Sequence, residues 1–286
     1  MKLKAWSLAL FGAMAMLAFA GSAGAVDGTI EINQAKVLAG SGFPFTISTA
    51  NTSYRLTGSL TVPASTNGIL VTANNVTIDM NGFSITGPGS TSGVVNGVSA
   101  GGIADVTVEN GTITGLGLAI VLGTSGIVRN VHADANGDGG IDVGDNSVVE
   151  GCTANNSTSN YGIACGGSGC AISGNTANGN ADEGIFCSGS GCQITGNTAN
   201  GNISVGIDCQ SNACVISGNT VLGNPSLGIG CFGTGCLISG NTVVNSADGI
   251  EAGDTTTGYS NNVLKNTANF FSGKSLGNNL CNGTVC

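Results

Sequence analysis

The chain has 286 residues, of which 41% are hydrophobic, 8% are charged and 50 are glycine. This much apolar composition with so little charge excludes an intrinsically disordered chain. The formal charge of −9 argues against nucleic acid or anionic lipid as a partner.

The N-terminus has the pattern of an export signal. Lys2 and Lys4 precede an uncharged apolar run at residues 5–20, and Ala-Gly-Ala at 23–25 is a small-residue cleavage signal. The run is short for a membrane span, so we predict a signal peptide over 1–25 and a secreted, periplasmic or cell-surface protein without a membrane span. Removing the two lysines leaves 5 basic residues against 16 acidic ones, a formal charge of −11.

Residues 26–53 are expected to form an N-terminal cap, because the sequence IEINQAKVLA at 30–39 suits a short amphipathic segment. The stretch 87–101 lengthens one later repeat and predicts an inserted loop. At the other end, residues 270–286 contain two phenylalanines and a cysteine pair, which suits a C-terminal cap. Such caps cover the open ends of a repeat structure.

Between these ends, four blocks of 22 residues run from Tyr161 to Asp248 and read G-I-x-C-x4-C-x-I-[ST]-G-N-T. One short strand cannot bury its own apolar face, so each block needs neighbours on both sides, as in a solenoid. The blocks are rich in Gly, Asn and Thr, which disfavours paired helices. We therefore predict an all-β fold, a parallel β-helix of roughly ten coils with 20–22-residue repeats over residues 54–269.

Strand alternation allows the coils to be aligned on one inward aliphatic column. The column is expected to contain Ile78, Val108, Val128, Val149, Ile172, Ile194, Ile216, Ile238 and Val263. A further coil around residues 56–62 precedes it. With strands about 4.8 Å apart, the rod would be about 45–50 Å long.

The sequence VTIDMNGF at 76–83 and the I-[ST]-G-N-T repeats resemble right-handed parallel β-helix proteins of the pectate-lyase-like superfamily, over about residues 54–269. The resemblance implies the fold of those exported bacterial proteins. It does not choose an activity, because the superfamily includes lyases, hydrolases, epimerases and noncatalytic surface proteins.

Eleven cysteines in an exported chain predict disulfides. The pairs with C-x4-C spacing are Cys165–Cys170, Cys187–Cys192, Cys209–Cys214, Cys231–Cys236 and Cys281–Cys286. Pairing within a coil competes with pairing between stacked coils, and zinc binding is a third possibility. The coil before the repeats has Val143 and Ser147 at the two cysteine positions. A coil therefore has either both cysteines or neither, which favours pairing within a coil. Cys152 is left over and is expected to be a free buried thiol.

Two further columns are interpreted as structural. Cys152 aligns with Asn175, Asn197, Asn219 and Asn241, and stacked amides of this kind can hydrogen-bond along a rod. Beside them runs an outward column of Thr176, Thr198, Thr220 and Thr242. Its neighbouring positions are too mixed for a uniform ice-binding plane, which favours solvated strand surface.

The candidate catalytic residues lie one position after the aliphatic column. They are Asp79, Glu109, Arg129 and Glu150. Two carboxylates about 5 Å apart match the separation in a retaining glycosidase, and an arginine beside carboxylates suits a lyase. His132 follows Arg129 by three residues. The alternative is a charge-compensated stack in which Arg129 neutralises its acidic neighbours.

A candidate calcium site consists of Asp134, Asn136, Asp138, Asp142 and Asp145. Their spacing resembles an EF-hand loop, with Asp in place of the usual final Glu. The flanking helices are absent from the sequence pattern, and a solvated Asp/Gly corner is the alternative.

These observations favour an exported noncatalytic β-helix, a surface or periplasmic scaffold that contacts extracellular or cell-wall polysaccharide along one strand face. The alternative is a polysaccharide lyase or glycoside hydrolase that uses the acidic and Arg129 column. The sequence indicates no required cofactor, with calcium as the candidate ion.

Overall fold

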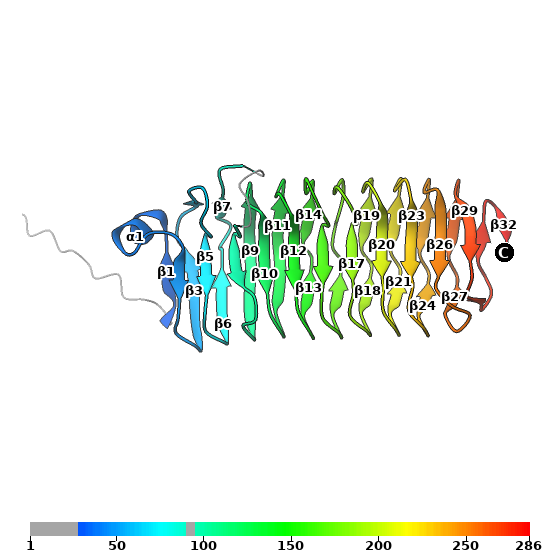
Figure 1. The fold of residues 1–286 in the computed structure, drawn as a ribbon, viewed down its shortest axis with the longest axis horizontal. Coiled ribbons are helices and arrows are strands. Elements are labelled where there is room, and N and C mark those ends of the chain that lie inside the picture. The colour runs from blue at the N-terminus through cyan, green and yellow to red at the C-terminus, as the bar shows by residue number, and fades with distance from the viewer. Residues whose placement is uncertain (1–27, 90–94) are drawn as a thin grey trace, which may run out of the picture.

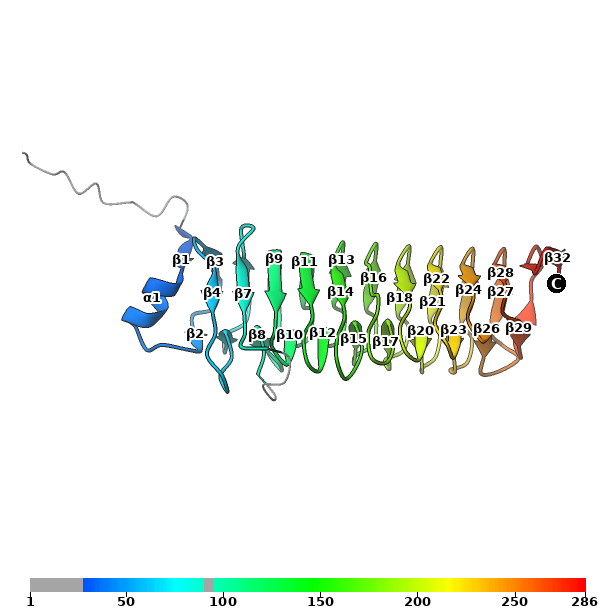
Figure 2. The same cartoon turned by 90° about the horizontal axis from the view of Figure 1, so that it is seen from above.

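The structure is a computed structural model that describes residues 28–89 and 95–286, so the predicted signal peptide lies outside the described residues. The described chain is a parallel β-helix of about ten coils, which confirms the predicted fold class. Figure 1 shows the coils stacked in sequence order, with helix α1 (Gln34–Ala39) at one end of the rod and β32 at the other. The first and second sheets run along opposite long sides of the rod (Figure 2).

The first sheet has 15 strands. They are β1 (Ile30–Ile32), β3 (Thr52–Leu56), β4 (Leu60–Thr61), β6 (Val76–Asp79), β7 (Ser84–Thr86), β9 (Val106–Thr114), β11 (Ile127–Asp134), β13 (Val148–Glu150), β14 (Thr153–Asn155), β16 (Ala171–Ser173), β18 (Gln193–Thr195), β21 (Val215–Ser217), β24 (Leu237–Ser239), β27 (Gly258–Ser260) and β30 (Lys274–Ser275).

The second sheet has 11 strands and the third has six. The second contains β2 (Phe45–Ile47), β5 (Ile69–Val71), β8 (Val98–Ala100), β10 (Leu118–Leu122), β12 (Gly139–Val143), β15 (Ile163–Cys165), β17 (Ile185–Cys187), β20 (Val205–Cys209), β23 (Leu227–Cys231), β26 (Asp248–Ala252) and β29 (Ala268–Phe271). The third contains β19 (Thr198–Asn200), β22 (Thr220–Leu222), β25 (Thr242–Val244), β28 (Val263–Lys265), β31 (Leu280–Cys281) and β32 (Thr284–Val285).

The inward aliphatic column of the first sheet is confirmed from Ile78 to Ile238, because each member is in register with the next and fully buried. Burying one such side chain contributes roughly 1.5–3 kcal/mol. The prediction for the following coil was wrong. Ile238 pairs with Tyr259, whereas Val263 lies in the third sheet opposite Thr242. This coil is 21 residues long, and the substitution of an aromatic residue for isoleucine hid the shorter step.

The glycine that precedes the repeated isoleucine is required by close packing. A Cβ atom at Gly184 would lie 2.6 Å from Nδ2 of Asn202 and 2.7 Å from the carbonyl oxygen of Gly206. The chain thus bends inward at this glycine while the next residue, Ile185, also fills the core with no exposed surface.

The asparagine column is a hydrogen-bonded ladder, as predicted. The amide of Asn197 donates to the carbonyl of Ile172 (2.9 Å) and to Oδ1 of Asn219 (3.1 Å). Its own Oδ1 accepts from the backbone and side-chain nitrogens of Asn175, at 2.9 and 3.0 Å. A second ladder, not predicted, joins Asn180, Asn202 and Asn224 in the same way. Each buried amide therefore provides hydrogen-bond partners for the amides of the neighbouring coils along the rod.

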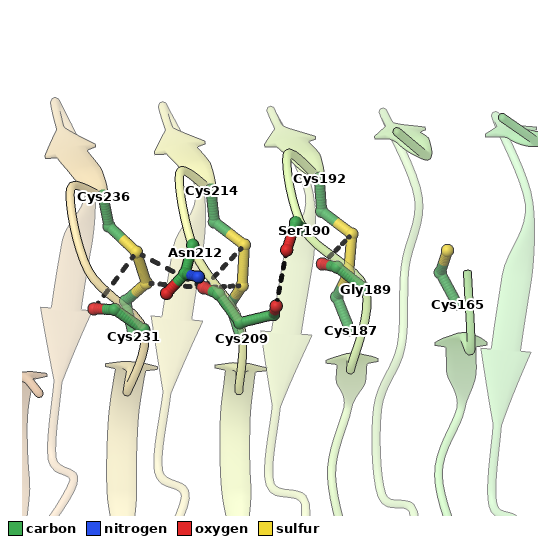
Figure 3. The surroundings of a disulfide bond; sticks show 12 residues. Cys165, Cys187, Gly189, Ser190, Cys192, Cys209, Asn212, Cys214, Cys231 and Cys236 are labelled. Carbon is green, nitrogen blue, oxygen red and sulfur yellow. Dashed lines mark hydrogen bonds between the residues drawn. A yellow bond between two sulfur atoms is a disulfide. The ribbon is translucent and has the colours of Figure 1, made fainter. Parts of the chain in front are cut away.

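The cysteines pair within coils, as predicted, and form five disulfides with Cα atoms 5.8–6.8 Å apart. Figure 3 shows three of the bridges following one another along the rod, each closing one corner. The sulfur atoms of neighbouring coils pack closely, since those of Cys165, Cys187 and Cys192 lie within 4.8 Å of one another. Cys152 is free and buried. Its backbone nitrogen donates to Oδ1 of Asn175, which places it at the head of the asparagine ladder.

The two ends of the rod differ. Helix α1 follows β1 and is capped by Asn33, whose side chain accepts from the backbone nitrogen of Lys36 at 3.0 Å; Val37 is its buried residue. At the other end, β29 continues the second sheet, and β31 and β32 pair antiparallel beside the Cys281–Cys286 bridge.

Residues 90–94 of the predicted inserted loop lie outside the described residues. In the part of the chain that is described, no helix has the length and apolar composition to cross a bilayer.

Candidate functional site

The charged column predicted on the first sheet is present. Asp79, Glu109, Arg129 and Glu150 lie opposite one another on successive strands β6, β9, β11 and β13. Parallel neighbours of this kind are about 4.8 Å apart, and the polar side chains point outward because the alternate positions fill the core. The sequence alignment of these four coils was therefore right.

Two ion pairs involve the charges of this column. Nε of Arg129 lies 3.3 Å from Oε2 of Glu150, with the two side chains 43% and 56% exposed. Arg55, which the sequence analysis missed, lies one coil before Asp79 and pairs with it at 3.4 Å. Asp79 also accepts hydrogen bonds from Asn81 and Asn110. Exposed ion pairs of this kind contribute about 0–1 kcal/mol to the free energy of unfolding. In both pairs the contact lies at the protein surface.

The surface around Arg129 is shallow. An open depression there is lined by Arg129, Asn130, Glu150, Gly151, Ser173 and Gly174. His132 does not join it, because Asn130 adopts a left-handed φ of 51° and turns the chain at a corner between them. Beyond this corner, Nδ1 of His132 contacts Oγ1 of Thr153 at 2.7 Å. The candidate catalytic residues therefore line a strand face rather than a deep cleft.

The residues of the predicted calcium loop are spread over two corners and a strand. Asp134 ends β11, and its Oδ1 accepts from Nδ2 of Asn156 at 2.8 Å. Asn136 is buried, and its amide oxygen accepts from the backbone nitrogen of Leu116 while its Nδ2 donates to the carbonyl of Ile113. Both the oxygen and the nitrogen of the Asn136 amide therefore hydrogen-bond to the backbone of the neighbouring coil.

The other three acidic residues flank or lie on β12. Asp138 precedes the strand, Asp142 is within it, and Asp145 follows it and accepts from the backbone nitrogen of Ser168 at 2.7 Å. Asp142 instead faces Tyr161, whose hydroxyl lies 3.3 Å from its Oδ2. The structure therefore does not gather the five side chains on one turn. Calcium binding by Asp134, Asn136, Asp138, Asp142 and Asp145 stays a prediction.

A second group of candidate side chains lies along the second sheet. The sheet register aligns Asp142, Ala164, Phe186, Asp208, Gly230 and Glu251. We call the aromatic–acid face the surface formed by Asp142, Tyr161, Glu183, Phe186, Asp208, Phe232 and Glu251. Acidic and aromatic side chains alternate along it, which distinguishes it from the Ser- and Thr-rich coils of the first sheet.

Two half-buried rings lie at the centre of this face. The rings of Tyr161 and Phe186 have centroids 6.4 Å apart and planes inclined by 12°, a stacked pair. Between Asp142 and Phe186 the register places Ala164, which is only 3% exposed. The small side chain leaves room for the ring of Tyr161. Burial, reinforced by the nearby Asp142 carboxylate, raises the pKa of Tyr161 far above its usual value, so the hydroxyl stays protonated.

Asp208 lies beside these rings and is 3% exposed. Its Oδ2 accepts from Nε2 of Gln210 at 2.8 Å, whereas its buried Oδ1 has no hydrogen-bond partner. On its far side, a Cβ atom at Gly230 would lie 2.7 Å from the ring of Phe232, so that ring covers Gly230 next to Asp208. An unsatisfied buried carboxylate oxygen is costly.

The electrostatics of the aromatic–acid face follow from burial and like charge. Burial raises the pKa of Asp208, and the carboxylates of Asp182 and Glu251 raise it further, against the opposing hydrogen bond from Gln210. Burial likewise raises the pKa of Asp142 and of Glu183. Perturbed carboxylates beside exposed rings are typical of functional sites rather than of plain solvated strands.

The sequence contained a signal for this face that was not used. The position marked x in G-I-x-C is Ala164, Phe186, Asp208 and Gly230 in the four repeats. Every other position of that motif is constant, so the variable outward position is where chemistry can differ between coils. The burial of Asp208 and the contact of Phe186 with Tyr161, which lies outside the motif, depend on the tertiary fold.

Solved structures with similar folds have low sequence identity to this chain. The Dettilon tailspike protein gp208 has a TM-score of 0.60 and 15% identity over 85% of this chain, which spans 60% of the tailspike chain. The A-module of Azotobacter vinelandii mannuronan C-5 epimerase AlgE4 has a TM-score of 0.50 and 14% identity, with 87% of this chain and 86% of that chain covered.

The Streptococcus pneumoniae surface protein and adhesin PfbA has a TM-score of 0.51 and 11% identity, with 89% of both chains covered. At these identities the similarity extends to the fold alone. No curated protein matches the sequence. A family model described as "Right handed beta helix region" matches residues 94–246, more than half of the chain. The chain therefore belongs to the right-handed β-helix family.

Proposed function

We propose that this protein is an exported, noncatalytic β-helix scaffold that contacts polysaccharide along the aromatic–acid face of its second sheet. The observation that carries the proposal is the stacked pair of Tyr161 and Phe186 between the carboxylates of Asp142 and Asp208. Sugar rings pack on exposed aromatic faces, and their hydroxyl groups donate to carboxylates. A strand face of this kind is long enough to follow a polymer.

Several findings support export and a glycan partner. Five disulfides suit an oxidising compartment. The fold is shared with a mannuronan epimerase module, a phage tailspike and a bacterial surface adhesin. Enzyme and adhesin alike use this architecture, so the fold by itself does not choose between them.

The noncatalytic part of the proposal rests on the first sheet. Glycan cleavage requires a polymer held in a fixed orientation and carboxyl groups with separate protonation roles. Asp79 is bonded to Arg55, Asn81 and Asn110, and the pair of Arg129 and Glu150 lies on an open surface. We expect these contacts to order the strand face rather than to act on a substrate.

A polysaccharide array with the mature protein, read for both binding and cleavage, tests the proposal. We expect binding that Tyr161→Ala abolishes and that Tyr161→Phe, which keeps the ring, largely preserves. Thr195→Ala, on the outer face of the first sheet, is the control and should bind like the native protein.

Assays of unsaturated-uronate absorbance and of reducing ends complete the test. Turnover that is lost in Glu109→Gln or Arg129→Ala, with folding intact, would show that the protein is a lyase or hydrolase. Binding that survives Tyr161→Ala would place the contact on another face.

A further inference from the structure

The aromatic–acid face contains no positive charge. All five Lys and Arg side chains of the described residues lie elsewhere: Lys36 on α1, Arg55, Arg129 and Lys274 on the first sheet, and Lys265 on the third. The acidic residues of this face therefore have no cationic partner from the protein, in contrast to those of the first sheet, where arginines pair with Asp79 and Glu150.

Asp208 shows most clearly that a partner is missing. Its Oδ1 is buried without a hydrogen bond, and Phe186 and Gly230 flank it in register. The ring that covers Gly230 belongs to Phe232, which is 41% exposed. The proposed contact requires that a donor reach Oδ1 beside this ring. The strongest donor for a buried carboxylate is a cationic one, because it satisfies the oxygen and the charge together.

The spacing of the acids suits a polymer rather than a small ion. Asp142 and Asp208 are three strands apart, about 14 Å, and Asp208 and Glu251 are two strands apart, about 10 Å. These separations are too large for the carboxylates to ligate one metal ion, whose oxygen ligands lie within about 2.6 Å of it. They suit charges repeated along an extended chain, with the Tyr161 and Phe186 rings between them.

We propose that the aromatic–acid face binds a polysaccharide that carries free amino groups, with an ammonium group on Asp208 and sugar rings on Tyr161 and Phe186. This inference rests on the proposed function and specifies its substrate class. Ammonium groups gain from carboxylates and from aromatic faces alike. A polyuronate would instead place its carboxylates against Asp142, Asp208, Glu183 and Glu251, where like charge repels it.

The test is calorimetric titration of the mature protein with four hexasaccharides at about pH 6 and roughly 0.15 M ionic strength, which screens nonspecific surface attraction. The ligands are a glucosamine hexamer, its fully N-acetylated form, a neutral glucan hexamer and a hexagalacturonate. We expect the amino hexamer to bind at least about tenfold more tightly than the acetylated one.

Two variants with the same change in charge separate the site from the overall acidity of the protein. Asp208→Asn should remove the preference for the amino hexamer. Asp105→Asn, at an exposed corner before β9, should keep it. A preference that survives Asp208→Asn overturns the inference, as does hexalysine binding as tightly as the amino hexamer.

If the acetylated, neutral or uronate hexamer binds as well as the amino hexamer, and Tyr161→Ala abolishes that binding, the inference fails while the proposed function stands. If no hexasaccharide binds, both fail.

Discussion

Replacing Asn197 by alanine tests whether the asparagine ladder holds the rod together. Asn197 is 1% exposed, and its side chain takes part in four hydrogen bonds. Some partners keep another bond: Nδ2 of Asn175 still donates to Val149, and Oδ1 of Asn219 still accepts from the backbone nitrogen of residue 197. The backbone nitrogen of Asn175 loses its partner, whereas the carbonyl of Ile172 loses one of two bonds and stays in the ladder between β16 and β18.

Leaving a buried polar group unsatisfied costs about 1–3 kcal/mol. For the backbone nitrogen of Asn175, we therefore expect Asn197→Ala to lower the free energy of unfolding by about 1–3 kcal/mol. The matched control is Thr198→Ala on the next residue, whose outward-facing side chain should matter by about 0.5 kcal/mol or less.

Urea unfolding followed by circular dichroism measures both variants. The dependence of the free energy on urea must be compared as well, because a solenoid can lose coils separately and then shows a smaller slope. A cost for Asn197→Ala no greater than that for Thr198→Ala would refute the view that the ladder stabilises the coils.

Three further predictions concern titration, thiols and calcium. Burial raises the pKa of Asp208, so the folded protein binds more protons than the unfolded chain; this group favours folding at low pH and opposes folding as the pH rises through the folded pKa. Asp208→Asn should therefore raise the melting temperature at pH 7, with the gain vanishing below about pH 4. A difference in melting temperature that stays the same across that pH range would contradict the prediction. Burial raises the pKa of Cys152 to about 11, so at pH 8 only about one thiol in a thousand is ionised. Alkylation followed by mass spectrometry should find no rapid labelling of the folded protein and one labelled cysteine after unfolding without reductant. A disulfide-linked peptide joining Cys165 to Cys187 would disprove the pairing within coils. Calcium titrated into the protein should give weak heats that Asp138→Ala reduces, whereas identical heats for both proteins would remove the site.

The sequence alone determined the repeat and what depends on it. A constant 22-residue period from residue 161 to 248 sets the register of those coils, because parallel strands can bury the repeated isoleucine only by stacking like on like. The asparagine ladder and the pairing of cysteines within coils followed from this period, whereas the charged column from Asp79 to Glu150 followed from strand alternation in the coils before it. Where an aromatic residue, Tyr259, takes the place of the repeated isoleucine, the alignment failed.

The tertiary structure decided which outward residues have partners. The column of Asp79 and Arg129 was visible in the sequence, but its pairing with Arg55 at one end and Glu150 at the other depends on side-chain directions that periodicity does not give. The same holds for Asp208, whose position in the repeat predicts an outward side chain although it is 3% exposed. Phe186 lies opposite it on the neighbouring strand, and the ring of Phe232 covers Gly230 on its other side. Such contacts between residues far apart in the chain arise only when the coils are stacked, so the sequence predicted the rod while the packing on its surface located the candidate site.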